Sequence, residues 1–313
     1  MSLRFGPSAR CAAGPVAVLA LALALSACTT SPSRPVSAGA TATINVVAAE
    51  NFWGNLAEQL GGPPVRVSSI IDNPDADPHD YEPTAADART VAGARLAIVN
   101  GVGYDAWADK LVAANPAADR IVLNVGDLVG VKAGGNPHRW YSATDVRKVI
   151  DQITADYKRL DAADAAFFDR QHDTVVNTNL KDYFRLIDQI RTTYAGTPVG
   201  ASESIFTPLA EATGLKLLTP ESFLDAISEG GDPTAADKAT IDDQITHRRI
   251  KVYVYNSQNA TPDVRAEVNA ARAAGIPVTT VTETLTPAGA TFQDWQVAQL
   301  TALKQALAQA TGE

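Results

Sequence analysis

The chain has 313 residues, of which 46% are hydrophobic and 19% charged, a composition typical of a globular protein with a sizeable core. Its formal charge is −9, from 35 acidic and 26 basic residues. Proteins that bind nucleic acid normally present a basic face, so this balance argues against nucleic acid as a partner. An acidic surface instead suits a soluble protein that attracts cations.

Residues 1–27 predict a secretory signal peptide. Arg4 and Arg10 precede an apolar run over 16–25, which is too short to span a bilayer comfortably. The tetrapeptide LSAC that follows, ending at Cys28, resembles the bacterial lipobox, in which the cysteine is lipidated and becomes the mature N-terminus. An ordinary secretory signal is the alternative, but Cys28 is the only cysteine beyond the signal and would have no disulfide partner.

Residues 28–41 are rich in Ser, Thr, Pro and Ala, which predicts a flexible tether between lipid and folded domain. Strand and helix signals then alternate over 42–160, the predicted N-terminal lobe. We expect strands at 43–48, 65–70, 96–100 and 120–124, and helices at 51–60, at 85–92 and around Trp107. Such alternation predicts a mostly parallel sheet that is covered on both faces.

No strand signal occurs between 143 and 194, where apolar residues recur at helical spacing. An Asp-rich break near 161–164 divides this region, and the second helix, over about 163–193, is much longer than the usual globular helix of about 12 residues. We assign 161–193 to one rigid connector helix. Residues 194–313 form the predicted C-terminal lobe, with strands at 198–201, 215–218, 251–255 and 277–281 and a terminal helix over 293–310. The expected fold class is therefore α/β, with two lobes joined by the connector.

The pentapeptide PTAAD occurs twice, at 83–87 and at 233–237. In each copy a threonine can cap a helix N-terminus, and the aspartate three residues later can complete the cap. We therefore expect helices to begin directly after Thr84 and Thr234.

Four polar residues follow predicted strands. In open α/β sheets, ligands bind beyond the carboxyl ends of the strands. This rule selects His79, His138, Glu203 and Glu283, two from each lobe, which could converge on one cleft between the lobes. Two imidazoles and two carboxylates form a suitable first shell for a divalent transition metal ion, and such a site should weaken in acid because its histidines must be neutral.

The candidate residues also have interpretations that involve no metal. A histidine in a polar loop such as that around His79 is more often simply solvated. The segment at 137–140 could be a turn whose tryptophan packs on the surface. His172, within the long helix, and His247, beside two arginines, lack placement at a strand end, and we assign both to the surface.

Four short motifs carry a resemblance to a known family. PHDYEPT at 78–84, NPHRW at 136–140, SESIF at 202–206 and TET at 282–284 resemble, in order, the four ligand motifs of the metal-specific solute-binding lipoproteins of bacterial ABC importers, the cluster that handles zinc and manganese. The resemblance spans essentially the whole mature chain.

The resemblance to this family implies two α/β lobes bridged by a rigid helix. It also implies that Zn²⁺ or Mn²⁺ is held between the lobes by His79, His138, Glu203 and Glu283. The fourth position is usually Asp in the family and is Glu283 here, and the histidine-rich loop of many zinc-dedicated members is absent. Glu203 resembles the manganese-type members, yet zinc binds such a shell more tightly, so the choice of ion stays open.

The leading hypothesis is a monomeric, lipid-anchored protein on the extracytoplasmic face of the bacterial membrane that delivers the ion to an ABC permease and is not an enzyme. A secreted metallohydrolase is one alternative, although four protein ligands would leave no position for a catalytic water and no supporting motif occurs. A surface adhesin with a structural metal is the other. Growth under metal starvation would separate it from a transport protein.

Overall fold

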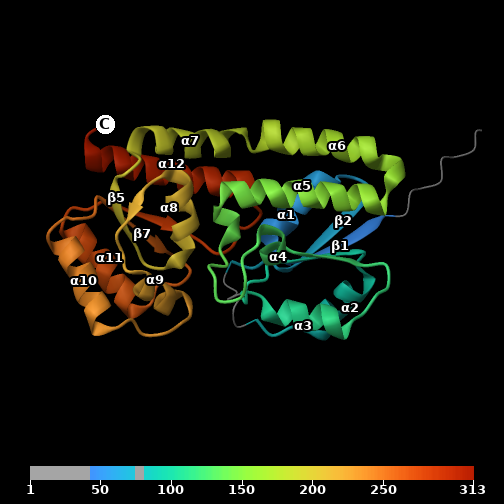
Figure 1. Cartoon of the computed structure of the whole chain (residues 1–313), viewed down its shortest axis with the longest axis horizontal. Coiled ribbons are helices and arrows are strands. Elements are labelled where there is room, and N and C mark those ends of the chain that lie inside the picture. Colours follow the sequence, from blue (N-terminus) through green and yellow to red (C-terminus); the bar gives the residue numbers. More distant parts are fainter. Residues whose placement is uncertain (1–42, 75–80) are drawn as a thin grey trace, which may run out of the picture. The chain divides into compact units, whose positions relative to one another are not determined.

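The computed structural model describes residues 43–74 and 81–313 of the chain. The predicted signal peptide at 1–27, the tether at 28–41 with its Cys28, and the proposed ligand His79 lie outside the described residues. Figure 1 shows two α/β lobes whose helices surround separate sheets.

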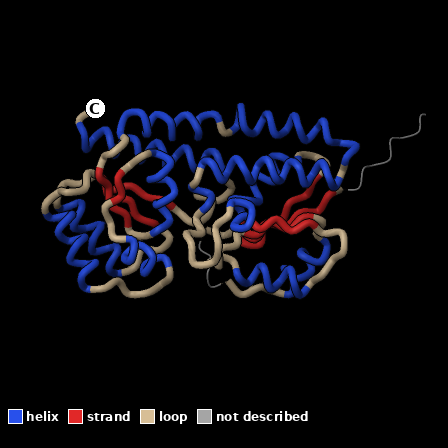
Figure 2. The backbone as a smooth tube through the Cα atoms, viewed as in Figure 1, coloured by secondary structure: helices blue, strands red, loops and turns tan. Residues whose placement is uncertain are grey.

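Each lobe contains a four-stranded sheet in which every strand pairing is parallel. The N-terminal sheet has the order β2-β1-β3-β4 and is formed by β1 (Ile44–Glu50), β2 (Val65–Ile71), β3 (Leu96–Val99) and β4 (Ile121–Asn124). The C-terminal sheet has the equivalent order β6-β5-β7-β8 and is formed by β5 (Pro198–Ala201), β6 (Lys216–Leu217), β7 (Val252–Asn256) and β8 (Val278–Val281). The predicted α/β class and parallel sheets are confirmed, and Figure 2 shows the strands gathered in two groups.

Helices connect and cover the strands in both lobes. Those of the N-terminal lobe are α1 (Asn51–Gly61), α2 (Ala85–Gly93), α3 (Ala106–Ala114), α4 (Val125–Val129) and α5 (Ala143–Leu160). Those of the C-terminal lobe are α8 (Thr207–Thr213), α9 (Glu221–Ser228), α10 (Ala235–Thr246), α11 (Pro262–Ala273) and α12 (Phe292–Thr311).

Both PTAAD copies begin a helix, as predicted. The Thr84 hydroxyl accepts from the Asp87 N–H at 3.3 Å, and the Asp87 carboxylate accepts from the Thr84 N–H at 2.7 Å, which completes a capping box at α2. At α10 the Thr234 hydroxyl accepts from the Asp237 N–H at 3.2 Å. These caps satisfy backbone donors that a helix N-terminus leaves unpaired.

The connector differs from the single predicted helix. It consists of α6 (Ala165–Thr174), a π-helical segment (Val175–Asn179) and α7 (Lys181–Tyr194), and it runs along one side of both sheets in Figure 1. The Leu180 N–H donates to the Val175 carbonyl five residues earlier, at 2.9 Å. The π segment, VVNTN, contains only β-branched residues and asparagines, which are weak helix formers, so the α-helical pairing is lost there. The division of the chain at residues 160 and 193 stays a prediction.

One hydrophobic core extends through both lobes. It includes Trp53 and Trp140 of the N-terminal lobe and Trp295 and Leu300 of α12 in a single cluster of buried side chains. A second cluster, around Tyr253, lies within the C-terminal lobe. Within the described ranges, no helix has both the length and the apolar character needed to cross a bilayer.

Hydrogen bonds also join the lobes between α1 and the segment that leads into α12. Asn51 Oδ1 accepts from the Leu285 N–H at 3.3 Å, and Asn55 Oδ1 accepts from the Phe292 N–H at 2.8 Å. The shared core and these contacts hold the carboxyl ends of the two sheets toward one another, where the candidate ligands lie.

Candidate metal site

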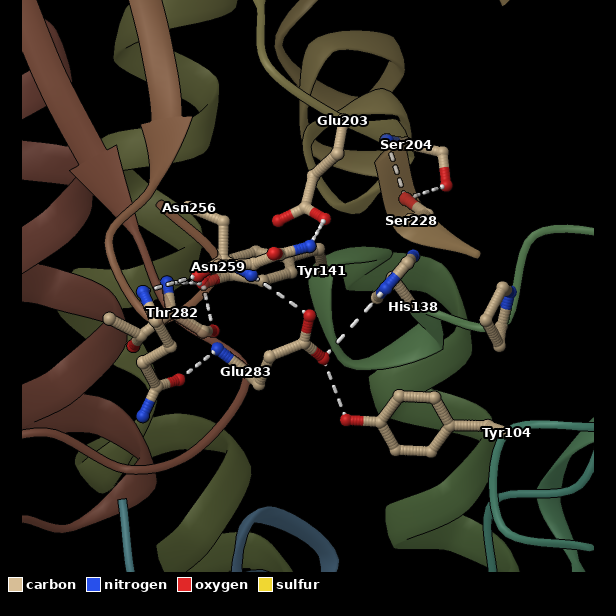
Figure 3. Close-up of polar contacts among 12 residues, drawn as sticks. Tyr104, His138, Tyr141, Glu203, Ser204, Ser228, Asn256, Asn259, Thr282 and Glu283 are labelled. Atoms are coloured by element: carbon tan, nitrogen blue, oxygen red, sulfur yellow. Dashed lines mark hydrogen bonds and ion pairs between the residues drawn. The ribbon is translucent and has the colours of Figure 1, made fainter. Parts of the chain in front are cut away.

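Loops beyond the strands of both sheets bring polar side chains together between the lobes (Figure 3). His138 follows β4 and α4 in the N-terminal lobe, whereas Glu203 and Glu283 follow β5 and β8 in the C-terminal lobe. All three are buried, with exposed fractions of 0%, 1% and 8% respectively. Buried imidazole and carboxylate groups need a partner that compensates for lost solvation, and a cation is a suitable one for the carboxylates.

The ring of His138 is fixed from two directions. Its Nδ1 lies 3.0 Å from Oδ1 of Asn136, which also accepts from the His138 backbone N–H at 3.0 Å. Because that oxygen is an acceptor, Nδ1 carries the proton and the lone pair lies on Nε2, the nitrogen that can bind a metal ion. Edge-to-face contacts with Trp140 and Tyr104, at centroid distances of 5.2 and 6.0 Å, hold the plane of the ring.

The amide of Asn136 is itself held by the other lobe. Its Nδ2 donates to the Ser204 carbonyl at 2.7 Å, which leaves Oδ1 directed at His138. The tautomer of this histidine is therefore set through a contact that crosses between the lobes.

Both carboxylate oxygens of Glu283 have a defined donor. Tyr104 donates its hydroxyl to Oε2 at 2.7 Å, and Asn256 donates from Nδ2 to Oε1 at 2.9 Å. Burial raises the pKa of Tyr104 well above its ordinary value, and the negative charges of Glu283 and Glu50 raise it further, so the phenol remains a donor at physiological pH. Each oxygen of Glu283 retains a lone pair for a cation.

The backbone around Glu283 is fixed by Gln258. Oε1 of Gln258 accepts from the N–H groups of Glu283 and Thr284, at 2.6 and 3.1 Å. Tyr141 adds a contact from the N-terminal lobe, because its hydroxyl donates to the Thr282 carbonyl at 3.0 Å.

Glu203 is held by the loop after β7. Nδ2 of Asn259 donates to Glu203 Oε2 at 3.0 Å. Next to it, the Ser204 N–H donates to the Ser228 hydroxyl at 3.1 Å. Asn256 and Asn259 thus place one carboxylate each, and Figure 3 shows both amides between Glu203 and Glu283.

The pair formed by His138 and Glu283 fits a divalent ion. Nε2 of His138 and Oε2 of Glu283 lie 3.9 Å apart. Two ligand atoms on one tetrahedral zinc ion lie about 3.4 Å apart, given metal–ligand distances near 2.1 Å, so a small approach of these atoms would complete the geometry.

Glu203 is not part of a compact cluster with this pair. Over residues 43–74 and 81–313, no group of three or more His, Cys, Asp or Glu side chains is close enough to hold a metal ion. The structure therefore brings together His138 and Glu283, places Glu203 in the neighbouring loop, and leaves His79 outside the described residues. The four-ligand set stays a prediction. His172 and His247 lie elsewhere, beside Asp151 and Asp243, as expected for surface residues.

A cavity of about 670 Å³ between the lobes leads to His138. Its lining includes glycines 103, 134 and 135, Glu221 and Asp225 of α9, and Glu229 directly after that helix. Burial raises the pKa of Asp225, and the charges of Glu221 and Glu229 raise it further. A cleft lined by one sign of charge raises the local concentration of ions of the opposite sign.

Sequence patterns alone did not identify the residues that hold the proposed ligands. Tyr104 lies beyond β3, and Asn256 and Asn259 lie at and beyond the end of β7, so the strand-end rule would have selected them. Phenols and amides are uncommon ligands for these ions, and for that reason the selection by side-chain type passed over them.

The chain was compared with protein-family models and known proteins. Residues 46–306 match the model of ZnuA, described as zinc-uptake complex component A, periplasmic. The chain belongs to this family. The ZnuA match covers β1 from Val46 onward, the strands β2 to β8, three of the loops that carry the candidate ligands and the segment that includes His79.

Curated relatives of this ZnuA-family chain are metal-binding lipoproteins by name. The manganese-binding lipoprotein MntA of Bacillus subtilis is 23% identical over 281 residues, which cover 84% of this chain and 86% of the relative. The manganese-binding lipoprotein MntA of Halalkalibacterium halodurans is 26% identical over 134 residues, but these span only 42% of that protein and 40% of this chain.

Solved structures of similar fold agree with the ZnuA match. A manganese-bound periplasmic metal-binding protein from Candidatus Liberibacter asiaticus, as an S38A mutant, superimposes with a TM-score of 0.72 at 20% identity. The superposition covers 85% of this chain and 100% of the other. At this identity the similarity establishes the fold alone.

Proposed function

We propose that the protein captures a divalent transition metal ion, Zn²⁺ or Mn²⁺, outside the cytoplasm and delivers it to an ABC-type permease. The observation that carries the proposal is the pair His138 and Glu283, whose ligand atoms come from opposite lobes and lie 3.9 Å apart. Membership of the zinc-uptake family and relatives named as manganese-binding or metal ABC transporter lipoproteins support it.

His79 and Glu203 complete the proposed shell. His79 would add a second imidazole from the N-terminal lobe, and Glu203 would reach the ion by a rotation of its side chain away from Asn259. A shell of two histidines and two carboxylates accepts Zn²⁺ with four ligands and Mn²⁺ with a bidentate carboxylate. The ion is cargo, so the proposed function includes no catalytic step.

The proposed location is the extracytoplasmic face of the bacterial membrane. Lipidation of Cys28 would anchor the chain, the 28–41 segment would act as tether, and the folded monomer would present its ion to the permease. The lipoprotein names of the relatives support this arrangement. Mass analysis of the membrane-extracted protein would test the anchor, because replacement of Cys28 by alanine should remove the lipid mass and release the protein.

Metal binding by the purified soluble chain tests the site. We expect the wild type to bind one ion per chain in elemental analysis, with competition between Mn²⁺ and Zn²⁺ identifying the preferred ion. His138→Ala and His79→Ala should each weaken binding at least about a hundredfold, since the loss of residues that only orient a ligand already costs ten- to a hundredfold.

His172→Ala is the matched control, because His172 on α6 pairs with Asp151 of α5 and is not a proposed ligand. This substitution should leave the metal affinity unchanged. Stoichiometric, unweakened binding by both His79→Ala and His138→Ala would show that the site is elsewhere.

A further inference from the structure

Glu50 is a buried acid that the proposed ligand shell does not use. It ends β1 at the centre of the N-terminal sheet and has an exposed fraction of 0%. In the part of the chain that the structure describes, neither of its carboxylate oxygens accepts a hydrogen bond from an N–H or O–H group. A buried carboxylate without donors is costly, whereas a neutral carboxylic acid is much less so.

Asp105 is within hydrogen-bonding reach of Glu50 and has the opposite environment. It is also buried at 0% exposure, but its two oxygens accept from the N–H groups of Asn100 and Gly101, both at 2.7 Å. These charge-assisted hydrogen bonds favour the ionised form of Asp105. Ionisation of two adjacent buried carboxyl groups is unfavourable because their negative charges repel each other. The hydrogen bonds to Asp105 therefore favour the state in which Asp105 is ionised and Glu50 is neutral.

We propose that Glu50 is a neutral carboxylic acid whose O–H donates to Asp105, and that this acid pair is a positioning element for the metal site. The inference rests on the proposed function only for its second half, because the hydrogen bond between the two acids is a separate claim.

The shifts of both groups agree with this assignment. Burial raises the pKa of Glu50 well above its ordinary value, and both the charge of Asp105 and a hydrogen bond with it raise it further, as does the charge of Glu283. Burial also raises the pKa of Asp105, but only to about 6, because backbone N–H groups stabilise its charge. Glu50 precedes the N-terminus of α1, whose dipole favours an anion, yet this effect offsets only part of the cost of burying an isolated charge.

Asp105 clamps a turn whose backbone is strained. Gly101, Val102 and Gly103 have φ values of 72°, 61° and 91°, and a β-branched residue such as Val102 rarely adopts this left-handed conformation. A side chain at Gly101 would also meet Asn124 Oδ1 at 2.2 Å. The two N–H bonds to Asp105 hold the beginning of this turn, and the Glu50 O–H would occupy one of the lone pairs that remain on Asp105.

The clamped turn carries two residues that position the proposed ligands. At its end, Tyr104 donates to Glu283 at 2.7 Å. At its beginning, Asn100 donates from Nδ2 to the Pro137 carbonyl at 2.9 Å, directly before His138, and accepts from Trp53 at 3.0 Å. A change in the acid pair would therefore displace contacts to both His138 and Glu283, although neither acid is a proposed ligand.

Two variants of Glu50 test the proposal. Glu50→Gln keeps a neutral donor to Asp105, so its metal affinity should stay within about threefold of the wild type. Glu50→Leu removes the donor at similar volume and should weaken binding about tenfold or more, as expected when a buried hydrogen bond to a charged group is lost. Affinity would be measured with Zn²⁺ and with Mn²⁺ by competition against a chromophoric chelator. Glu58→Gln, an exposed position on α1, is the matched control.

Infrared difference spectroscopy in D₂O gives a readout that a merely structural role would not change. The wild-type spectrum should contain a protonated-carboxyl C=O band that Glu50→Gln removes and Glu58→Gln retains. This band is measured without metal, so it remains informative if the wild type binds no ion and the proposed function fails. Absence of the band, or a loss of affinity in Glu50→Gln as large as in Glu50→Leu, would show that Glu50 is an anion and overturn the proposal.

Discussion

Glu267 on α11 is a buried acid outside the proposed ligand set. Its carboxylate accepts a short hydrogen bond from the Tyr253 hydroxyl within the second core cluster. Burial raises the pKa of Glu267 to about 7, with the charges of Asp263 and Asp242 adding to the rise and the Tyr253 hydroxyl opposing it. A single residue of this kind makes the stability of the whole chain depend on pH.

We predict that Glu267→Gln alters this dependence. The folded-state pKa lies above the ordinary value of 4.5, so the folded chain binds the proton more strongly than the unfolded chain. The stabilisation is fully present below about pH 4.5 and is lost as the pH rises toward 7. Relative to the wild type, the variant should therefore gain roughly 1–3 kcal/mol in free energy of unfolding between pH 4 and pH 8.

Urea denaturation at a series of pH values measures this difference. Glu58→Gln serves as the control, because it removes an exposed acid and should follow the wild-type curve. Parallel pH curves for the wild type and Glu267→Gln would contradict the prediction.

Among the helices, α9 is notable for the acidic residues that it contributes to the cavity. Glu221 and Asp225 of α9 and Glu229 directly after it line the cavity that leads to His138, and no Lys or Arg contributes to that lining within the described residues. The combined field of these acids should draw cations toward the site before any ligand is contacted.

We predict that the triple variant Glu221→Gln, Asp225→Asn, Glu229→Gln binds metal more slowly. The association rate at low ionic strength should fall about tenfold, and the difference should shrink at high salt because exposed charges are then screened. Stopped-flow measurement with a metal-responsive signal would show this.

The matched control neutralises three acids of the connector instead, Asp173, Asp182 and Asp188, whose side chains are mostly exposed. It should leave the association rate unchanged. A slowing of the α9 variant that is equal at low and high salt would exclude steering by charge.

For the molecule as a whole, we expect the shared core, more than the division into lobes, to determine how the chain unfolds. Trp53 and Trp140 pack in the same cluster as Trp295 of the terminal helix, and hydrogen bonds that Asn51 and Asn55 accept from the other lobe join the lobes. Separation of the lobes would expose this apolar surface to water.

We therefore predict that residues 43–313 unfold in a single cooperative transition. Differential scanning calorimetry should give equal calorimetric and van't Hoff enthalpies, and a fragment of residues 194–313 should not fold by itself. Two resolved transitions, or a folded fragment, would show that the lobes are independent.

The sequence predicted the strands to within two residues because β-branched runs bounded by turn residues leave few alternatives. It did not predict α4, whose five residues are too few to show a helical period, nor the π segment, because apolar spacing continues across it. At the site, side-chain chemistry identified His138 and Glu283. It did not identify Tyr104 or Asn256, whose roles depend on loops from distant parts of the sequence meeting in space.

The contact from Asn136 to the Ser204 carbonyl couples the tautomer of His138 to the spacing of the two lobes. It is one hydrogen bond of 2.7 Å across the two lobes, and it directs the amide oxygen that keeps the proton on Nδ1 of His138. A partner that pulls the lobes apart by the length of that bond would allow the amide to turn and the ring to exchange its proton between nitrogens. The nitrogen of His138 that offers its lone pair to an ion would thus depend on the spacing of the lobes, through a residue that is not itself a proposed ligand.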